Sequence, residues 1–138
     1  ATLAKLGYQG VEFAMNYGKL SPEEVAAYVK SLGLKCCGMH LGLDDLCNPQ
    51  CDGYKYAKAL NTPCVTTSIF TKEMEAEWPG LVKRAGEAGK VAKSLGFTFT
   101  YHNHAHEFIK IGGVYALDMM YRDTPADAVQ GELDTFWI

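Results

Sequence analysis

Short apolar segments alternate with longer amphipathic segments along the chain, and the junction between them repeats. Each junction has a basic or polar residue in what would be the last helical turn. Gly or Asn then follows, and both residues tolerate the left-handed backbone that ends a helix. Four clear junctions and a weaker fifth end at Gly7, Gly33, Asn61, Gly96 and Gly131. A short apolar run follows at residues 10–13, 34–40, 64–69, 97–102 and 132–138. The pattern predicts helices alternating with strands.

The starts of the predicted helices agree with this order. Ser21 and Glu24 have the spacing of a capping box, and Pro22 stands at the first helical position. A second segment, over residues 81–95, keeps its apolar positions at the period of a helix. The apolar stripe that follows the capping box consists of Val25, Val29 and Leu32.

Strands that alternate with helices indicate βαβ units and a parallel sheet covered by helices. The five junctions, from position 7 to position 131, have a mean spacing of 31 residues. Eight such units would need roughly 250 residues, the usual length of a (β/α)8 barrel. A five-stranded doubly wound sheet is the alternative, and it could be complete within 138 residues. That fold would be expected to carry a glycine-rich phosphate loop or an acidic cluster after its first strand, and neither is present.

Composition narrows the class of protein. The chain has 138 residues, of which 48% are hydrophobic and 21% charged, as in a soluble globular domain. It has no run of about 18 apolar residues, so we expect no membrane span. The formal net charge is −3 and there is no cluster of Lys and Arg, which argues against nucleic acid or an anionic membrane as the main partner.

The five cysteines are an odd number without a recognisable signal peptide, which predicts reduced thiols and a cytoplasmic protein. Cys47 and Cys51 have a loose zinc-ligand spacing, with His40 nearby. A structural zinc site usually has a second close pair of ligands, and the sequence has none. Thiols in the core or in a loop are therefore the favoured interpretation.

Polar residues that can bind a metal or act as an acid or base are concentrated where the predicted strands end. Parallel α/β folds place their active sites at these strand ends. All four histidines of the chain lie at such an end or just after it. Burying these groups costs free energy unless they are paired, so their concentration predicts a metal site or an acid–base site. Imidazole and carboxylate ligands suit Mn²⁺, Zn²⁺, Co²⁺ or Fe²⁺ better than Ca²⁺. The residues concerned are Glu12, His40, His102, His104, His106, Glu107 and Asp134.

Side chains alternate in direction along a strand, so His102 and His104 are expected to share one face and Asn103 to point to the other. If His102 binds a metal, His104 or Glu107 is placed to orient a substrate or to move protons.

Several segments resemble the sugar phosphate isomerase/epimerase family with the xylose isomerase-like TIM barrel. The most specific are Tyr-His-Asn-His-x-x-Glu-Phe at residues 101–108 and Leu-Asp-Thr-x-Trp at residues 133–137. Weaker likenesses lie at residues 6–13 and 38–43. The resemblance covers essentially the whole chain. It implies an α/β fold with a parallel sheet, a partial (β/α)8 TIM barrel of about strands 2 to 6 of 8, so that residues 1–138 form one incomplete domain.

The resemblance also implies a divalent metal (Mn, Zn, Co or Mg) held by four residues at the ends of strands five to eight. His102 and Asp134 match the first two positions, although many members have Glu where His102 stands, and Glu107 is the alternative ligand. Ketose epimerases of the family often have a sugar-contacting His at the position of Trp137. Trp137 at this position suggests stacking on a sugar face or packing in the pocket wall, and a substrate different from that of the ketose epimerases.

Glu12 and His40 stand where members of the family often line the substrate pocket, and Glu107 and His104 are the candidates for acid–base catalysis. The function implied is sugar or sugar phosphate isomerisation or epimerisation, by proton transfer next to a carbonyl. The alternatives are a lyase or dehydratase acting on a keto-sugar or inosose, and a non-catalytic carbohydrate-binding barrel. An endonuclease IV-type repair enzyme would need a three-metal site rich in His and a basic face, which the sequence does not show.

Ala1 as the first residue and the apolar end at residues 135–138 suggest an incomplete barrel. We expect strands 1, 7 and 8, with two of the four ligands, to lie outside residues 1–138. The polypeptide alone should then be inactive and bind metal weakly. Its open strand edges, at Val11 and at residues 135–138, should favour self-association.

Overall fold

The computed structural model describes residues 1–69 and 71–138. Its helices are α1 (Thr2–Lys5), α2 (Pro22–Ser31), α3 (Leu43–Leu46), α4 (Asp52–Ala59), α5 (Trp78–Ser94) and α6 (Ala116–Arg122), with 3₁₀ turns η1 (Lys72–Glu77) and η2 (Ala105–Phe108). Its main strands are β1 (Gly10–Ala14), β2 (Lys35–His40), β3 (Cys64–Thr67), β4 (Thr98–His102) and β7 (Gln130–Glu132). A small hairpin joins β5 (Lys110–Ile111) to β6 (Val114–Tyr115).

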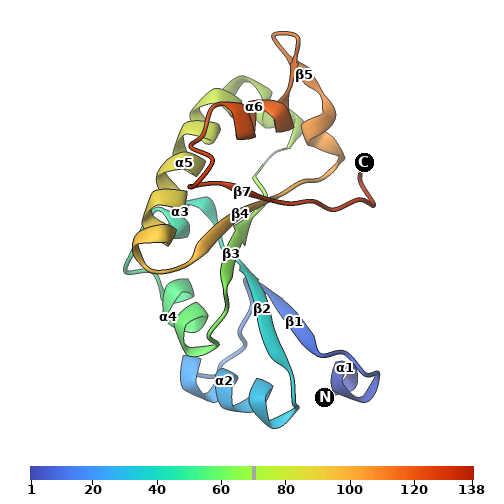
Figure 1. Ribbon diagram of the computed structural model, residues 1–138, viewed down its shortest axis with the longest axis vertical. Coiled ribbons are helices and arrows are strands. Elements are labelled where there is room, and N and C mark those ends of the chain that lie inside the picture. Colours follow the sequence, from blue (N-terminus) through green and yellow to red (C-terminus); the bar gives the residue numbers. More distant parts are fainter. Residues whose placement is uncertain (70) are drawn as a thin grey trace.

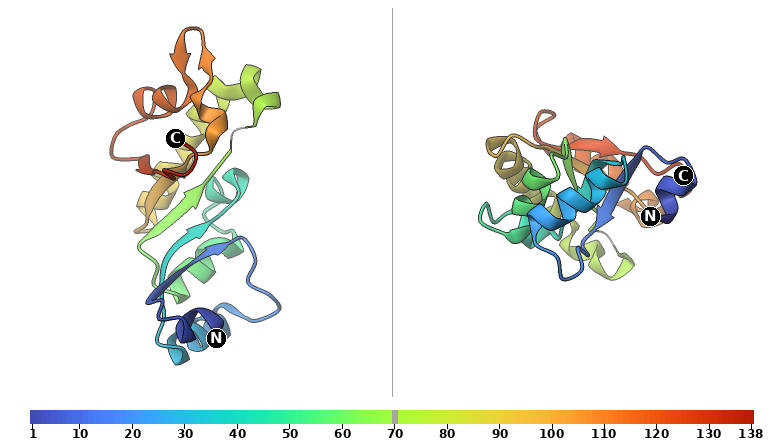
Figure 2. Two further views of the ribbon diagram at one scale, coloured as in Figure 1. Left: turned by 90° about the vertical axis from the view of Figure 1, so that its right-hand side faces the viewer. Right: turned by 90° about the horizontal axis from the view of Figure 1, so that it is seen from below.

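The five main strands form one parallel sheet in the order β1-β2-β3-β4-β7, which is also their order in the chain. Helices α2, α4 and α5 lie along the same side of this sheet (Figure 1), and the strands turn progressively along the long axis of the molecule (Figure 2). A doubly wound sheet would instead reverse its strand order and carry helices on both faces. Sequential order with helices on one side is the winding of a barrel, so the predicted partial (β/α)8 fold is confirmed. The sheet is not closed, because β1 and β7 are its two outer strands.

Four of the five predicted helix–strand junctions are confirmed by left-handed backbone. The φ angles are 88° at Gly7, 70° at Gly33, 52° at Asn61 and 88° at Gly96. The predicted capping box is also present, because the Ser21 backbone N–H donates to Glu24 at 2.7 Å and the Glu24 N–H donates to the Ser21 hydroxyl at 3.3 Å.

The fifth predicted junction, at Gly131, is wrong. Helix α6 ends at Arg122, and Gly131 lies inside β7, where it pairs with Tyr101 of β4. A Cβ atom on Gly131 would lie 3.1 Å from the Tyr121 hydroxyl oxygen, so this glycine allows the ring to approach rather than ending a helix. The strand therefore begins at Gln130, and it ends at Glu132 instead of continuing to residue 138.

The two faces of the sheet have different chemistry. The helix-covered face carries large apolar side chains that are fully or almost fully buried, including Met39, Val65, Phe99 and Tyr101. Residues one position away point to the other face because side chains alternate along a strand. Those residues are mostly polar: Glu12, His40, Thr66, Thr100, His102 and Glu132. In the described residues, no helix is long and apolar enough to cross a membrane.

Gly89 is the point of closest approach between α5 and the segment before β7. A Cβ atom there would collide with the backbone carbonyl of Ala128, which cannot move as a flexible side chain can. Gly89→Ala should therefore lower the free energy of unfolding by about 1–3 kcal/mol. Gly80→Ala in the same helix is the matched control, because a Cβ there meets nothing within 4 Å and should change stability by less than about 1 kcal/mol. Urea unfolding of the full-length gene product measures both, and equal midpoints for the two variants would contradict the prediction.

Candidate functional site

The parallel register brings the carboxyl ends of four strands together. His40 is the last residue of β2, His102 is the last of β4, and Glu132 is the last of β7. Glu12 is the middle residue of β1, and Asp134 follows β7 by two residues. His102 and Glu132 are direct partners in the pairing of β4 with β7. The site is therefore fixed by the sheet itself.

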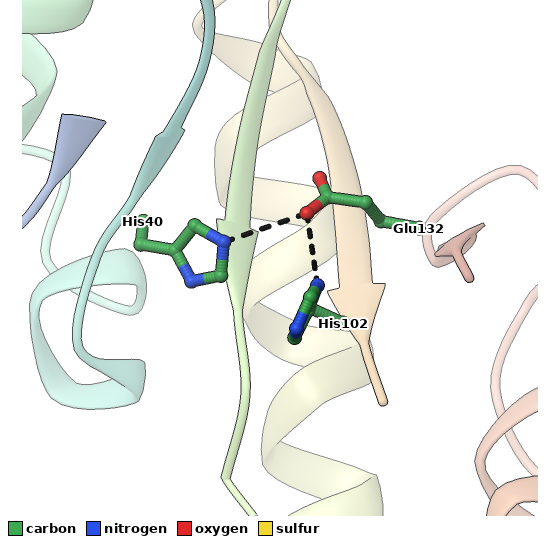
Figure 3. A group of neighbouring side chains, drawn as sticks. All are labelled: His40, His102 and Glu132. Atoms are coloured by element: carbon green, nitrogen blue, oxygen red, sulfur yellow. Dashed lines mark hydrogen bonds and ion pairs between the residues drawn. The ribbon is translucent and has the colours of Figure 1, made fainter. Parts of the chain in front are cut away.

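Carboxylates and imidazoles alternate across this end of the sheet. His40 Nε2 lies 3.3 Å from Glu12 Oε1 and 3.4 Å from Glu132 Oε1. The same Glu132 oxygen lies 3.1 Å from His102 Nδ1 (Figure 3). On the other side of the His102 ring, Nε2 lies 3.8 Å from Asp134 Oδ2. His102 thus has a carboxylate opposite each of its two ring nitrogens.

Two threonines on neighbouring strands form hydrogen bonds with the Glu132 carboxylate. The Thr66 hydroxyl donates to Glu132 Oε2 at 2.8 Å, and the Thr100 hydroxyl donates to it at 3.3 Å. The two hydroxyl oxygens are 2.7 Å apart. Because each hydroxyl has a single hydrogen, Thr100 divides its hydrogen between the Thr66 oxygen and Glu132, while Thr66 donates to Glu132 alone. Carboxylate hydrogen bonds of this kind fix both the position and the charge of the group.

Protonation in the cluster follows from these contacts. The hydrogen bond from His40, helped by those from Thr66 and His102, lowers the pKa of Glu132 to about 2. The same hydrogen bond to Glu132, helped by the negative charge of Glu12, raises the pKa of His40. Burial, with the neighbouring charge of Glu132, raises the pKa of Glu12. Glu132 is thus the anionic centre of the cluster, and the two carboxylates beside His40 favour the protonated form of its ring.

Asn103 holds Asp134 in place beyond the end of the strand. Its side chain is fully buried and pairs with the Asp134 backbone, accepting from the N–H at 3.0 Å and donating to the carbonyl at 3.3 Å. The Phe136 N–H donates to Asp134 Oδ1 at 2.9 Å. The other carboxylate oxygen, Oδ2, is the one that faces His102.

The structure brings His104 and Trp137 to the edge of the cluster. The His104 ring lies 5.0 Å from the His102 ring and 5.5 Å from the Trp137 ring, measured between centroids. Trp137 is 40% exposed, so one side of its ring is open to a ligand. Six of the seven predicted site residues are therefore neighbours: Glu12, His40, His102, His104, Asp134 and Trp137.

Glu107 is the predicted site residue that the structure places elsewhere. It is fully buried in η2, where the Tyr101 hydroxyl donates to Oε1 at 2.7 Å and the His104 backbone N–H donates to Oε2 at 2.8 Å. Both oxygens of the carboxyl group are thus occupied by donors from the protein. In this arrangement Glu107 supports the loop that carries His104.

Sequence reasoning missed Glu132. The signal was available, because Glu132 and Asp134 are two residues apart, the same spacing that predicted a shared face for His102 and His104. The role of Glu132 depends on its hydrogen-bond partners. One of them, Thr66, lies 66 residues away in the chain, so the contact cannot be seen in the sequence.

Among the described residues, one group of three offers ligand atoms close enough for a single metal ion. These atoms belong to His40, His102 and Glu132 and lie within 4.8 Å of one another. His102 and Asp134 form a second place where imidazole and carboxylate face each other. Both sets of donors suit a divalent transition metal. Cys47 belongs to neither, and its thiol donates instead to the Arg84 carbonyl oxygen.

The fold is shared with several solved structures. A sugar phosphate isomerase/epimerase from Parabacteroides distasonis ATCC 8503 has a TM-score of 0.82 and 22% sequence identity, over 98% of this chain and 58% of that one. A xylose isomerase-like TIM barrel protein from Mycobacterium smegmatis, in complex with magnesium, has a TM-score of 0.70 and 15% identity, over 94% and 53%. A D-psicose 3-epimerase in the presence of D-fructose has a TM-score of 0.64 and 14% identity, over 98% and 56%.

The chain thus spans a little more than half the length of these proteins, and at such identities the likeness is one of fold. No curated protein matches its sequence. A family model for the xylose isomerase-like TIM barrel, however, matches residues 1–138. The resemblance predicted from the motifs at residues 101–108 and 133–137 is confirmed, and the chain belongs to the xylose isomerase-like TIM barrel family.

Proposed function

We propose that this protein is a divalent-metal-dependent sugar or sugar phosphate isomerase or epimerase, with His102 and Asp134 as two of its metal ligands. One observation carries the proposal: His102 ends its strand between two carboxylates, 3.1 Å from Glu132 and 3.8 Å from Asp134. An imidazole oriented by one carboxylate and facing a second is a common arrangement around protein-bound metals.

The Asp134 side of the ring is the better place for the ion. On the Glu132 side, the carboxylate oxygens already have protein partners: His40 Nε2 lies 3.4 Å from Oε1, and the Thr66 hydroxyl donates to Oε2. On the Asp134 side, the 3.8 Å separation is too long for a hydrogen bond, so a metal ion between the two atoms would break no hydrogen bond between them. A cation bound there would polarise the carbonyl and hydroxyl oxygens of a sugar.

The surrounding residues fit a small polar substrate. We place Glu12 and His40 along one side of the bound substrate, where their polar atoms can bind hydroxyl groups. Trp137 is placed to stack on a sugar face, and His104 to orient the reacting part of the substrate. Among the structural neighbours, one is a magnesium complex and one is a D-psicose 3-epimerase solved in the presence of D-fructose, which supports a metal and a sugar for this site. Five free thiols support a cytoplasmic location.

The test is solvent hydrogen exchange by the full-length gene product. It is incubated in D₂O with Mn²⁺ and a panel of ketoses, aldoses, their phosphates and inososes, and the products are followed by NMR. We expect deuterium to enter next to the carbonyl of one substrate, and EDTA to lower the rate by about 100-fold or more. Loss of water from a keto-sugar or inosose would establish the lyase or dehydratase alternative. Saturable binding without exchange would establish a carbohydrate-binding barrel.

A further inference from the structure

We infer that Glu132 is a positioning residue that fixes the ring of His102, so that Nε2 is directed at the metal position beside Asp134. The inference rests on the proposed function for the presence of the metal. It concerns a residue that the sequence motifs did not single out.

Glu132 is itself immobilised. Its Oε2 accepts from Thr66 of β3 and from Thr100 of β4, so three neighbouring strands hold one carboxylate. The two hydroxyl oxygens lie 2.7 Å apart, so the single hydrogen of Thr100 is divided between Thr66 and Glu132, and Thr66 directs its own hydrogen at Glu132. The side chain is only 28% exposed, which limits competition from water. Such a carboxylate is a rigid acceptor.

This acceptor selects one form of the His102 ring. Glu132 Oε1 lies 3.1 Å from Nδ1 and, as a carboxylate, it can only accept a hydrogen bond. The neutral imidazole has one N–H, and the contact places that hydrogen on Nδ1. Nε2 then keeps its lone pair, which is what a metal ligand requires.

Two further rings keep His102 from turning. The His40 ring lies 5.2 Å from it at an angle of 71°, and the His104 ring lies 5.0 Å from it at 72°. Both are edge-to-face contacts, one on the side of β2 and one on the side of η2. The ring is therefore held in the plane that points Nε2 at Asp134 Oδ2.

The experiment reads the tautomer directly, by long-range ¹H–¹⁵N NMR of the metal-free, histidine-labelled full-length gene product at pH 8. We expect His102 to carry its hydrogen on Nδ1 in the unaltered protein and to become a mixture of tautomers in Glu132→Ala. With Zn²⁺ as the probe, Nε2 should be the coordinated nitrogen and Nδ1 should keep its hydrogen. Glu132→Ala should weaken Zn²⁺ binding by about 10–100-fold. Glu87→Ala, an exposed glutamate on α5, is the matched control and should change neither result.

If Glu132→Ala fails to fold, Glu132→Gln takes its place: it keeps the shape of the side chain, removes the charge and can present its amide NH₂ to Nδ1, so the share of the Nδ1–H tautomer should fall. A hydrogen on Nε2 in the unaltered protein would overturn the inference. Coordination of Zn²⁺ through Nδ1 would also overturn it, and would place the ion among His40, His102 and Glu132. Absence of Zn²⁺ binding together with an Nδ1 hydrogen that depends on Glu132 would overturn the proposed function while supporting the positioning role.

Discussion

Asp134→Asn in the full-length gene product should weaken Mn²⁺ binding by about 100-fold or more, equivalent to roughly 2.8 kcal/mol of binding free energy. The substitution removes the charged oxygen that faces His102 Nε2 at 3.8 Å. It keeps an oxygen that can accept from the Phe136 N–H, and it leaves the backbone contacts with Asn103 unchanged. The free energy of unfolding without metal should therefore change by less than about 1 kcal/mol. Isothermal titration with Mn²⁺ and urea unfolding measure the two quantities separately.

Asp118→Asn provides the matched control for this prediction, because Asp118 is an exposed aspartate on α6. It makes the same chemical change away from the site and should leave Mn²⁺ affinity unaltered. Unchanged affinity in Asp134→Asn would exclude Asp134 as a ligand. Loss of binding in His40→Asn, with Asp134→Asn unaffected, would place the ion in the group formed by His40, His102 and Glu132.

Local chemistry explains why so much of the fold could be predicted. A Gly or Asn at the end of a helix is needed wherever the backbone becomes left-handed, and this requirement is local to a few residues. Gly7, Gly33, Asn61 and Gly96 satisfy it. Gly131 occurs for a different reason, because the Tyr121 ring packs against it from α6, and such tertiary packing leaves no local pattern. The error moved the start of one strand by two residues and left the order of the sheet unchanged.

Site residues inside a strand could be predicted, because side chains alternate between the two faces of the sheet with a period of two residues. Glu12, His40 and His102 lie on the polar face because they alternate with apolar neighbours that are buried or half-buried. Beyond β4 and β7 the chain leaves that period, and side-chain hydrogen bonds decide where residues point. After β7 ends, the Asn103 side chain accepts a hydrogen bond from the Asp134 backbone N–H and so sets the position of Asp134. The Tyr101 hydroxyl donates to the Glu107 carboxylate, which holds Glu107 in the interior. These hydrogen bonds join residues that come close to each other only in the folded protein, so the sequence pattern does not predict them.

A carboxyl group near a histidine cluster can stabilise the fold or take part in catalysis, and substitutions of Glu107 distinguish these two roles. Because it is fully buried and accepts from the Tyr101 hydroxyl and the His104 N–H, Glu107→Ala should lower the free energy of unfolding by about 3–5 kcal/mol. The cost has two sources: two donors lose their partner, and the removed side chain leaves a cavity. Glu107→Gln keeps the shape and one acceptor oxygen, so about 1–2 kcal/mol should be lost. Urea unfolding measures both variants.

Glu87→Ala again serves as the exposed control and should change stability by less than about 0.5 kcal/mol. An unfolding midpoint for Glu107→Ala equal to that of the unaltered protein would contradict a structural role. If Glu107→Gln instead keeps its stability and abolishes hydrogen exchange from the sugar, Glu107 is the catalytic acid or base that the sequence motif predicted. The donors now held by Glu107 would then have to release it when substrate binds, since both of its oxygens are occupied in this structure. A strong loss of stability with a proportionate loss of activity would assign Glu107 to the support of the His104 loop.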